Sequence, residues 1–234
     1  EWRAVLEEYE GDRVLVAEAW VSPVERLARY VRSDEMHQAF NFAFLTTRWD
    51  APALREVVTS SLRANDEVAA PTTWVLSNHD VVRHATRLGL DQSAPLPNGI
   101  GAQDTQPDEE LGLRRARAAA LLMLALPGSA YVYQGEELGL PEHTTLDDEQ
   151  RQDPTWIRTE RVHRGRDGCR VPLPWSAAEP AFGFSPSGAS WLDQPESFAR
   201  YALDAQRGVA GSTYEVYRSA LRLRATDADT LHNY

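Results

Sequence analysis

Lysine is absent from this chain, and every one of its 24 basic residues is arginine. The absence excludes Schiff-base lysine chemistry and a phosphate-binding loop lysine within these residues. The single cysteine, Cys169, excludes an internal disulfide framework and multi-cysteine zinc sites. The longest apolar run, Ala118–Leu126, is far shorter than the roughly 18–20 residues that span a bilayer. We therefore expect no membrane partner.

Acidic residues outnumber basic ones, 35 against 24, for a net charge of −11. This balance argues against a nucleic-acid-binding surface. An acidic chain with one cysteine is compatible with the cytoplasm, which we take as the expected compartment. The 234 residues, of which 42% are hydrophobic, suffice for one globular domain with a sizeable core.

Apolar runs alternate with amphipathic stretches, which indicates α/β architecture. The apolar runs predict four buried parallel strands, each followed by a helix. This is the pattern of half an eightfold βα barrel, although an open doubly wound sheet uses the same alternation. Strands are predicted at 14–17, 39–45, 72–76 and 130–133, helices at 2–9, 52–62, 108–126 and 214–221, and a long Pro-rich loop at 140–195.

Glu18 is the first candidate catalytic residue, because it directly follows the apolar run Val14–Ala17. A carboxyl group at the end of a buried strand is predicted to be partly desolvated, which suits a general acid at neutral pH. A solvated strand-end acid, or one paired with an arginine, is the alternative.

A second polar group, Asn78, His79 and Asp80, directly follows the strand predicted at 72–76. Its amide, imidazole and carboxylate could grip hydroxyl groups. A helix N-cap is the alternative for Asp80. One histidine and one carboxylate do not specify a metal site, and we expect neither a metal nor a cofactor.

The Pro-rich loop contains Arg166-Asp167-Gly168-Cys169-Arg170, followed by a stretch that ends at Trp175. Its arginines can hold carboxylates or hydroxyls with a rigid fork. Taken alone, this segment is better interpreted as a surface loop ordered by local pairs, and Cys169 as a buried or bystander thiol.

Taken together, these motifs resemble the α-amylase superfamily, the family 13 glycoside hydrolases, in its α-glucosidase and oligo-1,6-glucosidase branch. Val14–Trp20 resembles the fifth-strand motif, Ser77–Asp80 the seventh-strand motif, and Gln134–Leu140 the eighth-strand end. Arg166–Trp175 resembles a stretch typical of that branch. The motifs occur in the family's order and spacing, and the resemblance covers almost the whole chain.

The resemblance implies a role for each candidate. Glu18 would be the general acid/base, and Asp80 the carboxylate that distorts the reacting glucose toward the transition state. His79, with Asn78 beside it, would bind the same sugar. Arg170 would lie near the non-reducing end of the substrate, and Arg83 is a weaker substrate-loop candidate. Two further residues, Phe42 and Phe44, line the pocket or fill the barrel.

The resemblance is incomplete, because the family's nucleophile motif, Gly-Phe-Arg-Xaa-Asp, does not occur here. We expect residues 1–234 to be the C-terminal half of a (β/α)8 barrel, strands 5–8, without the N-terminal half and the C-terminal β-sandwich. The isolated chain is then expected to be inactive. Its unpaired sheet edges favour self-association.

The predicted activity of the parent enzyme is retaining hydrolysis of α-glucosidic bonds in short oligosaccharides. Alternatives are a trehalose- or sucrose-active transglucosidase of the same superfamily, or a non-catalytic amylase-like binding module. An unrelated nucleotide-binding enzyme is disfavoured, since no G-x-G-x-x-G follows a strand.

Overall fold

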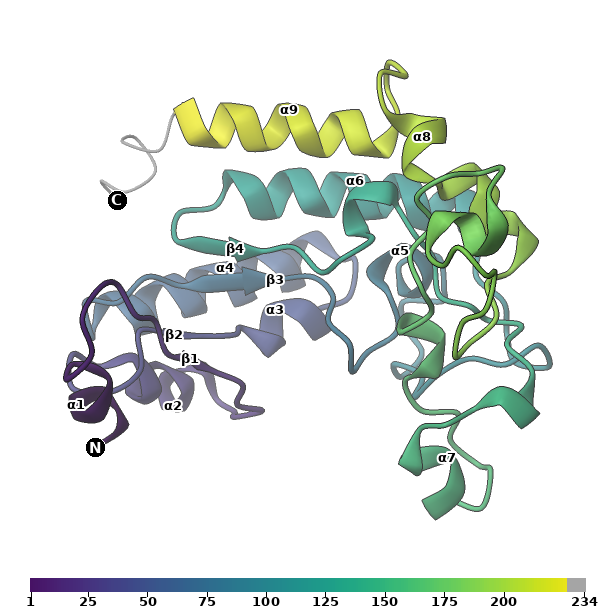
Figure 1. The fold of residues 1–234 in the computed structure, drawn as a ribbon. Helices are drawn as coiled ribbons and strands as arrows, with labels where there is room; N and C mark the ends of the chain where they lie inside the picture. The colour runs from purple at the N-terminus through teal and green to yellow at the C-terminus, as the bar shows by residue number, and fades with distance from the viewer. Residues whose placement is uncertain (227–234) are drawn as a thin grey trace. The chain divides into compact units, whose positions relative to one another are not determined.

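The computed structural model describes residues 1–226 (Figure 1). These residues divide into two units. Unit 1 comprises Glu1–Leu76 and Met123–Tyr131. Unit 2 comprises Ser77–Leu122 and Val132–Ala225. No helix among residues 1–226 is both long and apolar enough to cross a membrane.

Four short parallel strands form the centre of unit 1. The pairs are β1 with β2 and β3 with β4, and a parallel bridge from Phe40 to Thr73 joins the two pairs. The strands therefore follow one another in chain order without reversal, as in a barrel, whereas a doubly wound sheet reverses its order. Their bounds are β1 Val16–Ala17, β2 Gln38–Ala39, β3 Thr73–Val75 and β4 Ser129–Tyr131.

Helices connect these parallel strands, because a parallel pair needs a long crossover. The first crossover holds α2 and η1, the second α3 and α4, and the third α5 and α6. The helices predicted near residues 2–9, 52–62 and 108–126 are confirmed as α1, α4 and α6. The bounds are α1 Trp2–Leu6, α2 Val24–Ala28, η1 Arg29–Val31, α3 Phe42–Thr46, α4 Ala51–Asp66, α5 His84–Arg87 and α6 Glu109–Ala125.

The strand predicted at 39–45 is wrong beyond Phe40, because Phe42–Thr46 forms α3. Asn41 caps this helix, since its Oδ1 accepts a hydrogen bond from the Phe44 amide at 3.0 Å. Asn41 Nδ2 also donates to Ser61 Oγ on α4 at 2.7 Å, so the cap is buried and held from two sides. Local capping overrides the strand propensity of the apolar run.

Two phenylalanines of α3 are buried in unit 1. Phe44 packs edge-to-face on Trp74 of β3, with ring centroids 5.1 Å apart. Phe42 stacks on Trp20 at 4.2 Å. Of the two roles that the sequence left open, these contacts favour core filling for Phe44.

Gly128, in the turn between α6 and β4, has φ +98°, and a Cβ there would lie 2.2 Å from the Thr72 carbonyl oxygen. Gly128→Ala is expected to lower the free energy of unfolding by about 2–4 kcal/mol, because backbone strain of roughly 1–2 kcal/mol adds to the clash. Gly211→Ala is the matched control, since Gly211 has φ +78° and nothing lies within 4 Å of its Cβ position. Urea unfolding measures the free energy of unfolding of both variants. Equal losses of this free energy in the two variants would contradict a close approach at Thr72.

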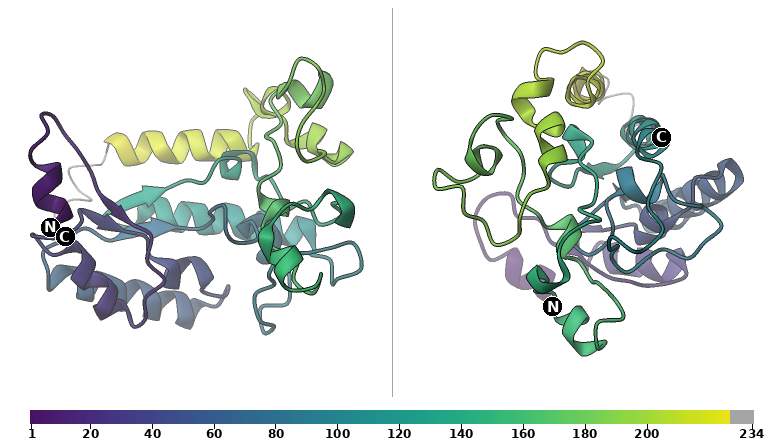
Figure 2. Two further views of the ribbon diagram at one scale, coloured as in Figure 1. Left: turned by 60° about the horizontal axis from the view of Figure 1, so that its bottom comes forward. Right: turned by 90° about the vertical axis from the view of Figure 1, so that its right-hand side faces the viewer.

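Unit 2 contains the long helix α9, Thr213–Thr226, as predicted near residues 214–221. It runs beside α6 in Figures 1 and 2, and Arg117 of α6 donates to the Gly211 carbonyl at 2.7 Å. An apolar cluster packs nearby in the same unit. Its buried members are Leu138, Leu140, Leu146, Val171, Leu173, Leu192, Phe198 and Tyr201.

The segment 140–195 is irregular, as predicted, and is interrupted only by short helices. Asp153 and Asp147 cap two of them, α7 and η3, through their side chains. The bounds in and around this segment are η2 Glu136–Leu138, η3 Asp148–Gln150, α7 Pro154–Arg158, η4 Asp167–Cys169, η5 Pro180–Gly183, η6 Glu196–Tyr201 and α8 Leu203–Gln206.

Candidate active site

Glu18 directly follows β1 in unit 1, as predicted from the apolar run before it. Its side chain is exposed, so the partial burial that we predicted is wrong. β1 pairs only with β2 among the described residues, and the strand ends at the buried Ala17. One flank of the Glu18 position therefore has no neighbouring strand to desolvate it.

The loop after β3 is held by side-chain hydrogen bonds within unit 2. Ser77 Oγ lies 2.8 Å from the ring Nδ1 of the buried His84 and accepts the His84 amide at 2.9 Å. Asn78 Oδ1 accepts the Asp80 amide at 2.9 Å, which forms a local turn. Asn78 thus orients Asp80, and this contact favours a local role over the predicted contact with substrate.

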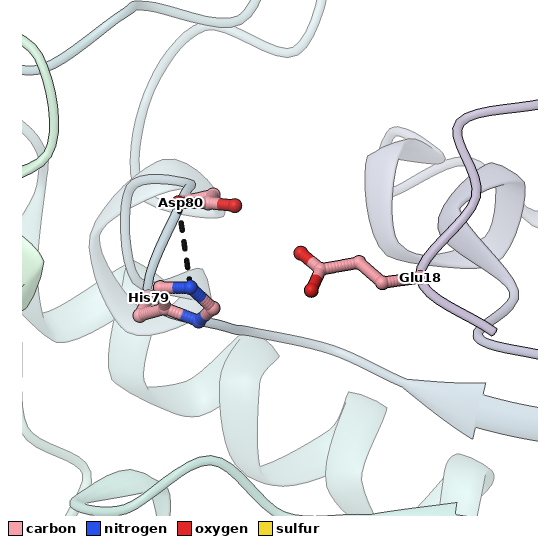
Figure 3. A group of neighbouring side chains, drawn as sticks. All are labelled: Glu18, His79 and Asp80. Carbon is pink, nitrogen blue, oxygen red and sulfur yellow. Dashed lines mark ion pairs between the residues drawn. The ribbon is translucent and has the colours of Figure 1, made fainter. Parts of the chain in front are cut away.

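Asp80 is brought together with His79 and two arginines from the distant loop segment. Its Oδ1 accepts Arg166 Nη1 at 2.8 Å and Arg170 Nη2 at 3.0 Å. His79 Nε2 lies 3.6 Å from the same oxygen, as the dashed line in Figure 3 marks. The Asp80 side chain is 22% exposed, so the carboxylate remains accessible. Glu18, also drawn in Figure 3, belongs to unit 1.

The pKa of Asp80 is set by opposing effects. Burial alone raises it, but the hydrogen bond from Arg166 and the charges of His79, Arg166 and Arg170 outweigh burial and lower the pKa. The carboxylate is therefore ionised at neutral pH. An accessible, ionised carboxylate beside an imidazole can accept hydrogen bonds from sugar hydroxyls and stabilise positive charge.

Arg170 connects the loop segment with the strand-end motif. Its Nε donates to the His79 carbonyl at 2.8 Å, in addition to the bond from Nη2 to Asp80. The structure thus brings Arg170 together with His79 and Asp80 in unit 2, and its place near the non-reducing end of a substrate stays a prediction. The sequence separation is 90 residues between Arg170 and Asp80.

Arg166 and Asp153 form a pair that sequence reasoning missed. Asp153 is buried, and its Oδ2 accepts the Arg166 amide at 2.9 Å and Arg166 Nε at 2.5 Å. The pKa of Asp153 is lowered, because these hydrogen bonds outweigh the opposing effect of burial. The only local signal was Asp153-Pro154, which is typical of a helix start. It indicated the cap of α7 and gave no sign of Arg166.

Arg83 is buried, which differs from the substrate-loop position that we predicted. Its guanidinium donates to the carbonyls of Gln134 at 2.8 Å and Cys169 at 2.9 Å. It also lies over the ring of Tyr133, 4.7 Å from the centroid. These contacts favour a role in holding loops together over direct contact with substrate.

A buried carboxyl, Glu136, follows β4 in the motif at 134–140. Burial raises its pKa to about 8, against the hydrogen bond from Tyr217 Oη and the charges of Arg87 and Arg83. Glu136 is therefore largely protonated at neutral pH. Among the described residues, Glu142 behaves similarly, and burial raises its pKa to about 7.

Glu136→Gln is expected to flatten the pH dependence of stability. In the unfolded chain Glu136 titrates near 4.5, and in the folded protein near 8. Its stabilising contribution is present below pH 4.5 and is lost as the pH rises toward 8, at up to about 1.4 kcal/mol per unit. Urea unfolding between pH 5 and 8 measures this slope. Glu137→Gln is the control, and a slope equal to wild type in Glu136→Gln would contradict the burial argument.

His79 and Asp80 are residue types that can also ligate a metal ion. His79 and Asp80 offer two ligands within unit 2, fewer than the three of catalytic zinc sites. The Asp80 carboxylate is also engaged by Arg166 and Arg170. The arrangement is better suited to binding a polyhydroxyl ligand than a cation.

Comparison with known proteins defines the class. Residues 1–233 match the family described as "Alpha amylase, catalytic domain". The chain therefore belongs to the alpha-amylase catalytic domain family, and the predicted resemblance is confirmed.

The curated relatives that the chain resembles include a probable alpha-glucosidase and a maltase. It is 35% identical over 192 residues to a probable alpha-glucosidase of Rhizobium meliloti, covering 82% of this chain and 31% of that protein. It is 28% identical to Maltase A2 of Drosophila melanogaster, covering 97% and 36% respectively. The chain thus spans about a third of the length of these two relatives.

Solved structures confirm the fold. An α-glucosyl transfer enzyme, XgtA, aligns with TM-score 0.80 at 31% identity, over 99% of this chain and 39% of that one. A trehalose-6-phosphate hydrolase of Bacillus licheniformis aligns with TM-score 0.74 at 20% identity, over 93% and 41%. The chain is a portion of the barrel fold of these enzymes.

Proposed function

We propose that the complete gene product containing this chain is a retaining glycoside hydrolase that cleaves α-glucosidic bonds of short oligosaccharides. The observation that carries the proposal is the Asp80 carboxylate, held ionised by two arginines beside His79 at the end of a parallel strand. Family membership and relatives named for α-glucosides support it.

The chain corresponds, in this proposal, to strands 5–8 of the barrel. Four parallel strands in chain order support this, with Glu18 after the first strand and Asp80 after the third. These are the positions at which the family resemblance expects the fifth- and seventh-strand motifs. Carboxyl ends of barrel strands carry the chemistry in such folds.

The proposed reaction has two steps. A carboxylate nucleophile forms a bond to the anomeric carbon while Glu18 donates its proton to the leaving oxygen, and the glycosidic bond breaks. Glu18 then removes a proton from water, which attacks the same carbon and releases glucose with the nucleophile restored. Asp80 stabilises the positive charge that develops on the sugar in both steps.

The nucleophile motif does not occur in these 234 residues. In this mechanism two carboxyl groups must lie about 5–5.5 Å apart, one to attack and one to protonate. We therefore propose that this chain alone does not turn over substrate, and that its activity requires a nucleophile from elsewhere in the complete gene product.

A transglucosidase is the second candidate. The observation that favours it is the likeness at 31% identity to a solved α-glucosyl transfer enzyme. Transfer differs from hydrolysis only in the second step, in which a sugar hydroxyl replaces water. A non-catalytic amylase-like module is the third possibility and predicts no turnover at all.

The test is an assay of the complete gene product and of residues 1–234 on maltose, isomaltose, trehalose, sucrose and p-nitrophenyl α-glucoside. We expect the complete protein to release glucose, with the α-anomer appearing first in proton NMR. The chain of 234 residues should be inactive. A β-anomer first would overturn retention, oligosaccharide products would favour transfer, and an inert complete protein would favour the non-catalytic module.

A further inference from the structure

The turn that presents both arginines to Asp80 is η4, Asp167–Cys169. Arg166 precedes this turn and Arg170 follows it, so its position sets where both guanidinium groups lie. Arg166 is also held by Asp153. The carbonyl group of Cys169 directly precedes Arg170 in the chain, and Arg83 Nη2 donates a hydrogen bond to it. What fixes that carbonyl therefore fixes the backbone from which Arg170 reaches Asp80.

Two side chains donate hydrogen bonds to the Cys169 carbonyl oxygen. Arg83 Nη2 donates at 2.9 Å and Tyr133 Oη at 3.0 Å. The Arg83 guanidinium lies over the Tyr133 ring, and its Nη1 binds the Gln134 carbonyl at 2.8 Å. We call the group of Arg83, Tyr133 and the Cys169 carbonyl the carbonyl clamp.

The clamp rests on a buried carboxyl group. Glu142 Oε2 accepts the Arg83 amide at 3.0 Å. Gly168, in the middle of η4, packs so closely on Glu142 that a Cβ there would lie 2.4 Å from Oε1. Arg83 and η4 thus both contact the same buried side chain.

We propose that Arg83 and Tyr133 are positioning residues, which act through the Cys169 carbonyl to orient Arg170 against Asp80. The inference rests on the proposed glycosidase function. Three loops meet in the clamp, those that follow β3 and β4 and the one containing η4, and each brings a residue that the others require. Arg83 takes this role in place of the predicted substrate contact.

A double-mutant cycle tests whether the clamp acts through Arg170. Tyr133→Phe keeps the ring under Arg83 and removes one hydrogen bond. In the complete gene product, we expect it to lower kcat/KM on p-nitrophenyl α-glucoside about 10-fold, the scale of one buried hydrogen bond. In an Arg170→Ala background, the same change should cost less than about 2-fold. A merely structural role would cost the same in both backgrounds and would overturn the proposal.

Tyr131→Phe is the matched control. Tyr131 lies two residues earlier, on β4, and its hydroxyl donates to Gln38 Oε1 at 2.8 Å, away from η4. It loses one hydrogen bond of the same kind, and we expect kcat/KM to stay within about 2-fold of wild type. Arg83→Lys keeps the positive charge but cannot donate to two carbonyls at once as the guanidinium does. It should lower kcat/KM as Tyr133→Phe does.

A second measurement does not depend on activity. Cys169 is buried in η4, and burial raises the pKa of its thiol above its ordinary value. Its alkylation by iodoacetamide, followed by peptide mass spectrometry, reports opening of the turn. Tyr133→Phe and Arg83→Lys should speed labelling several-fold, and Tyr131→Phe should not. Unchanged labelling in the first two overturns the clamp.

The two measurements separate failure of this inference from failure of the proposed function. An inert wild-type protein refutes the glycosidase, and labelling then still decides whether the clamp holds η4. Active protein with faster labelling but unchanged kcat/KM refutes positioning of Arg170. Faster labelling together with a background-dependent loss of kcat/KM supports the proposal.

Discussion

Glu18→Gln in the complete gene product is expected to lower kcat on maltose about 10²–10⁴-fold, the usual contribution of a positioned general acid. Glutamine has nearly the same shape as glutamate but cannot give up a proton to the leaving glucose. The alkoxide of a sugar is a poor leaving group without that proton. Bond cleavage should therefore become very slow on natural disaccharides.

With p-nitrophenyl α-glucoside, Glu18→Gln should slow the first step less than it does with maltose, because p-nitrophenolate leaves without protonation. A burst of p-nitrophenol is then expected, followed by slow turnover limited by water attack without a base. Azide, which attacks without deprotonation, should restore turnover. Glu25→Gln is the control, since Glu25 is an exposed acid on α2. Equal losses on both substrates, with no rescue by azide, would contradict the acid/base role.

Asp80→Asn is expected to lower kcat/KM about 10³-fold on maltose and on p-nitrophenyl α-glucoside alike. The substitution removes two interactions. One is the attraction between the Asp80 carboxylate and the positive charge that develops on the sugar, and the other is the ion pairing of Asp80 with Arg166 and Arg170. Neither depends on the leaving group, so the ratio between the two substrates should stay near that of wild type. This separates Asp80 from Glu18 in the same assay.

Azide should not rescue Asp80→Asn, because the missing group transfers no proton. Asp66→Asn, at an exposed carboxylate near the end of α4, serves as the control. Circular dichroism checks that the variant is folded, and Arg166 keeps its bond to Asp153 in any case. A loss under about 5-fold on both substrates would contradict the assigned role of Asp80, since removal of one stabilising charge usually costs far more.

Much of the fold could be predicted from local patterns. The helices around 52–62 and 108–126 carry start signals, Pro52 and Asp108, that act within a few residues, and both helices are present. The prediction failed at Phe42–Thr46, where the apolar run indicated a strand. Asn41 caps a helix there and bonds to Ser61, a residue 20 positions away that the local pattern does not reveal.

Only part of the candidate site could be predicted from local patterns in the same way. Polar residues after apolar runs drew attention to Glu18, Asn78, His79 and Asp80, because side chains at strand ends share one edge. The surroundings of these groups could not be predicted. Glu18 is exposed where burial was expected, and Arg83 is buried where a substrate contact was expected.

By itself the sequence determined the strand and helix alternation, the family and the residue types at the strand ends. These depend on periodicity, capping and motif spacing, which all act over short stretches of chain. Only the tertiary structure decided that Asp80 meets Arg166 and Arg170, 86 and 90 residues further along. An irregular segment has no periodicity that encodes its partners. Its course is set by buried groups, such as Asp153 and Glu142, that must find hydrogen bonds once water is excluded.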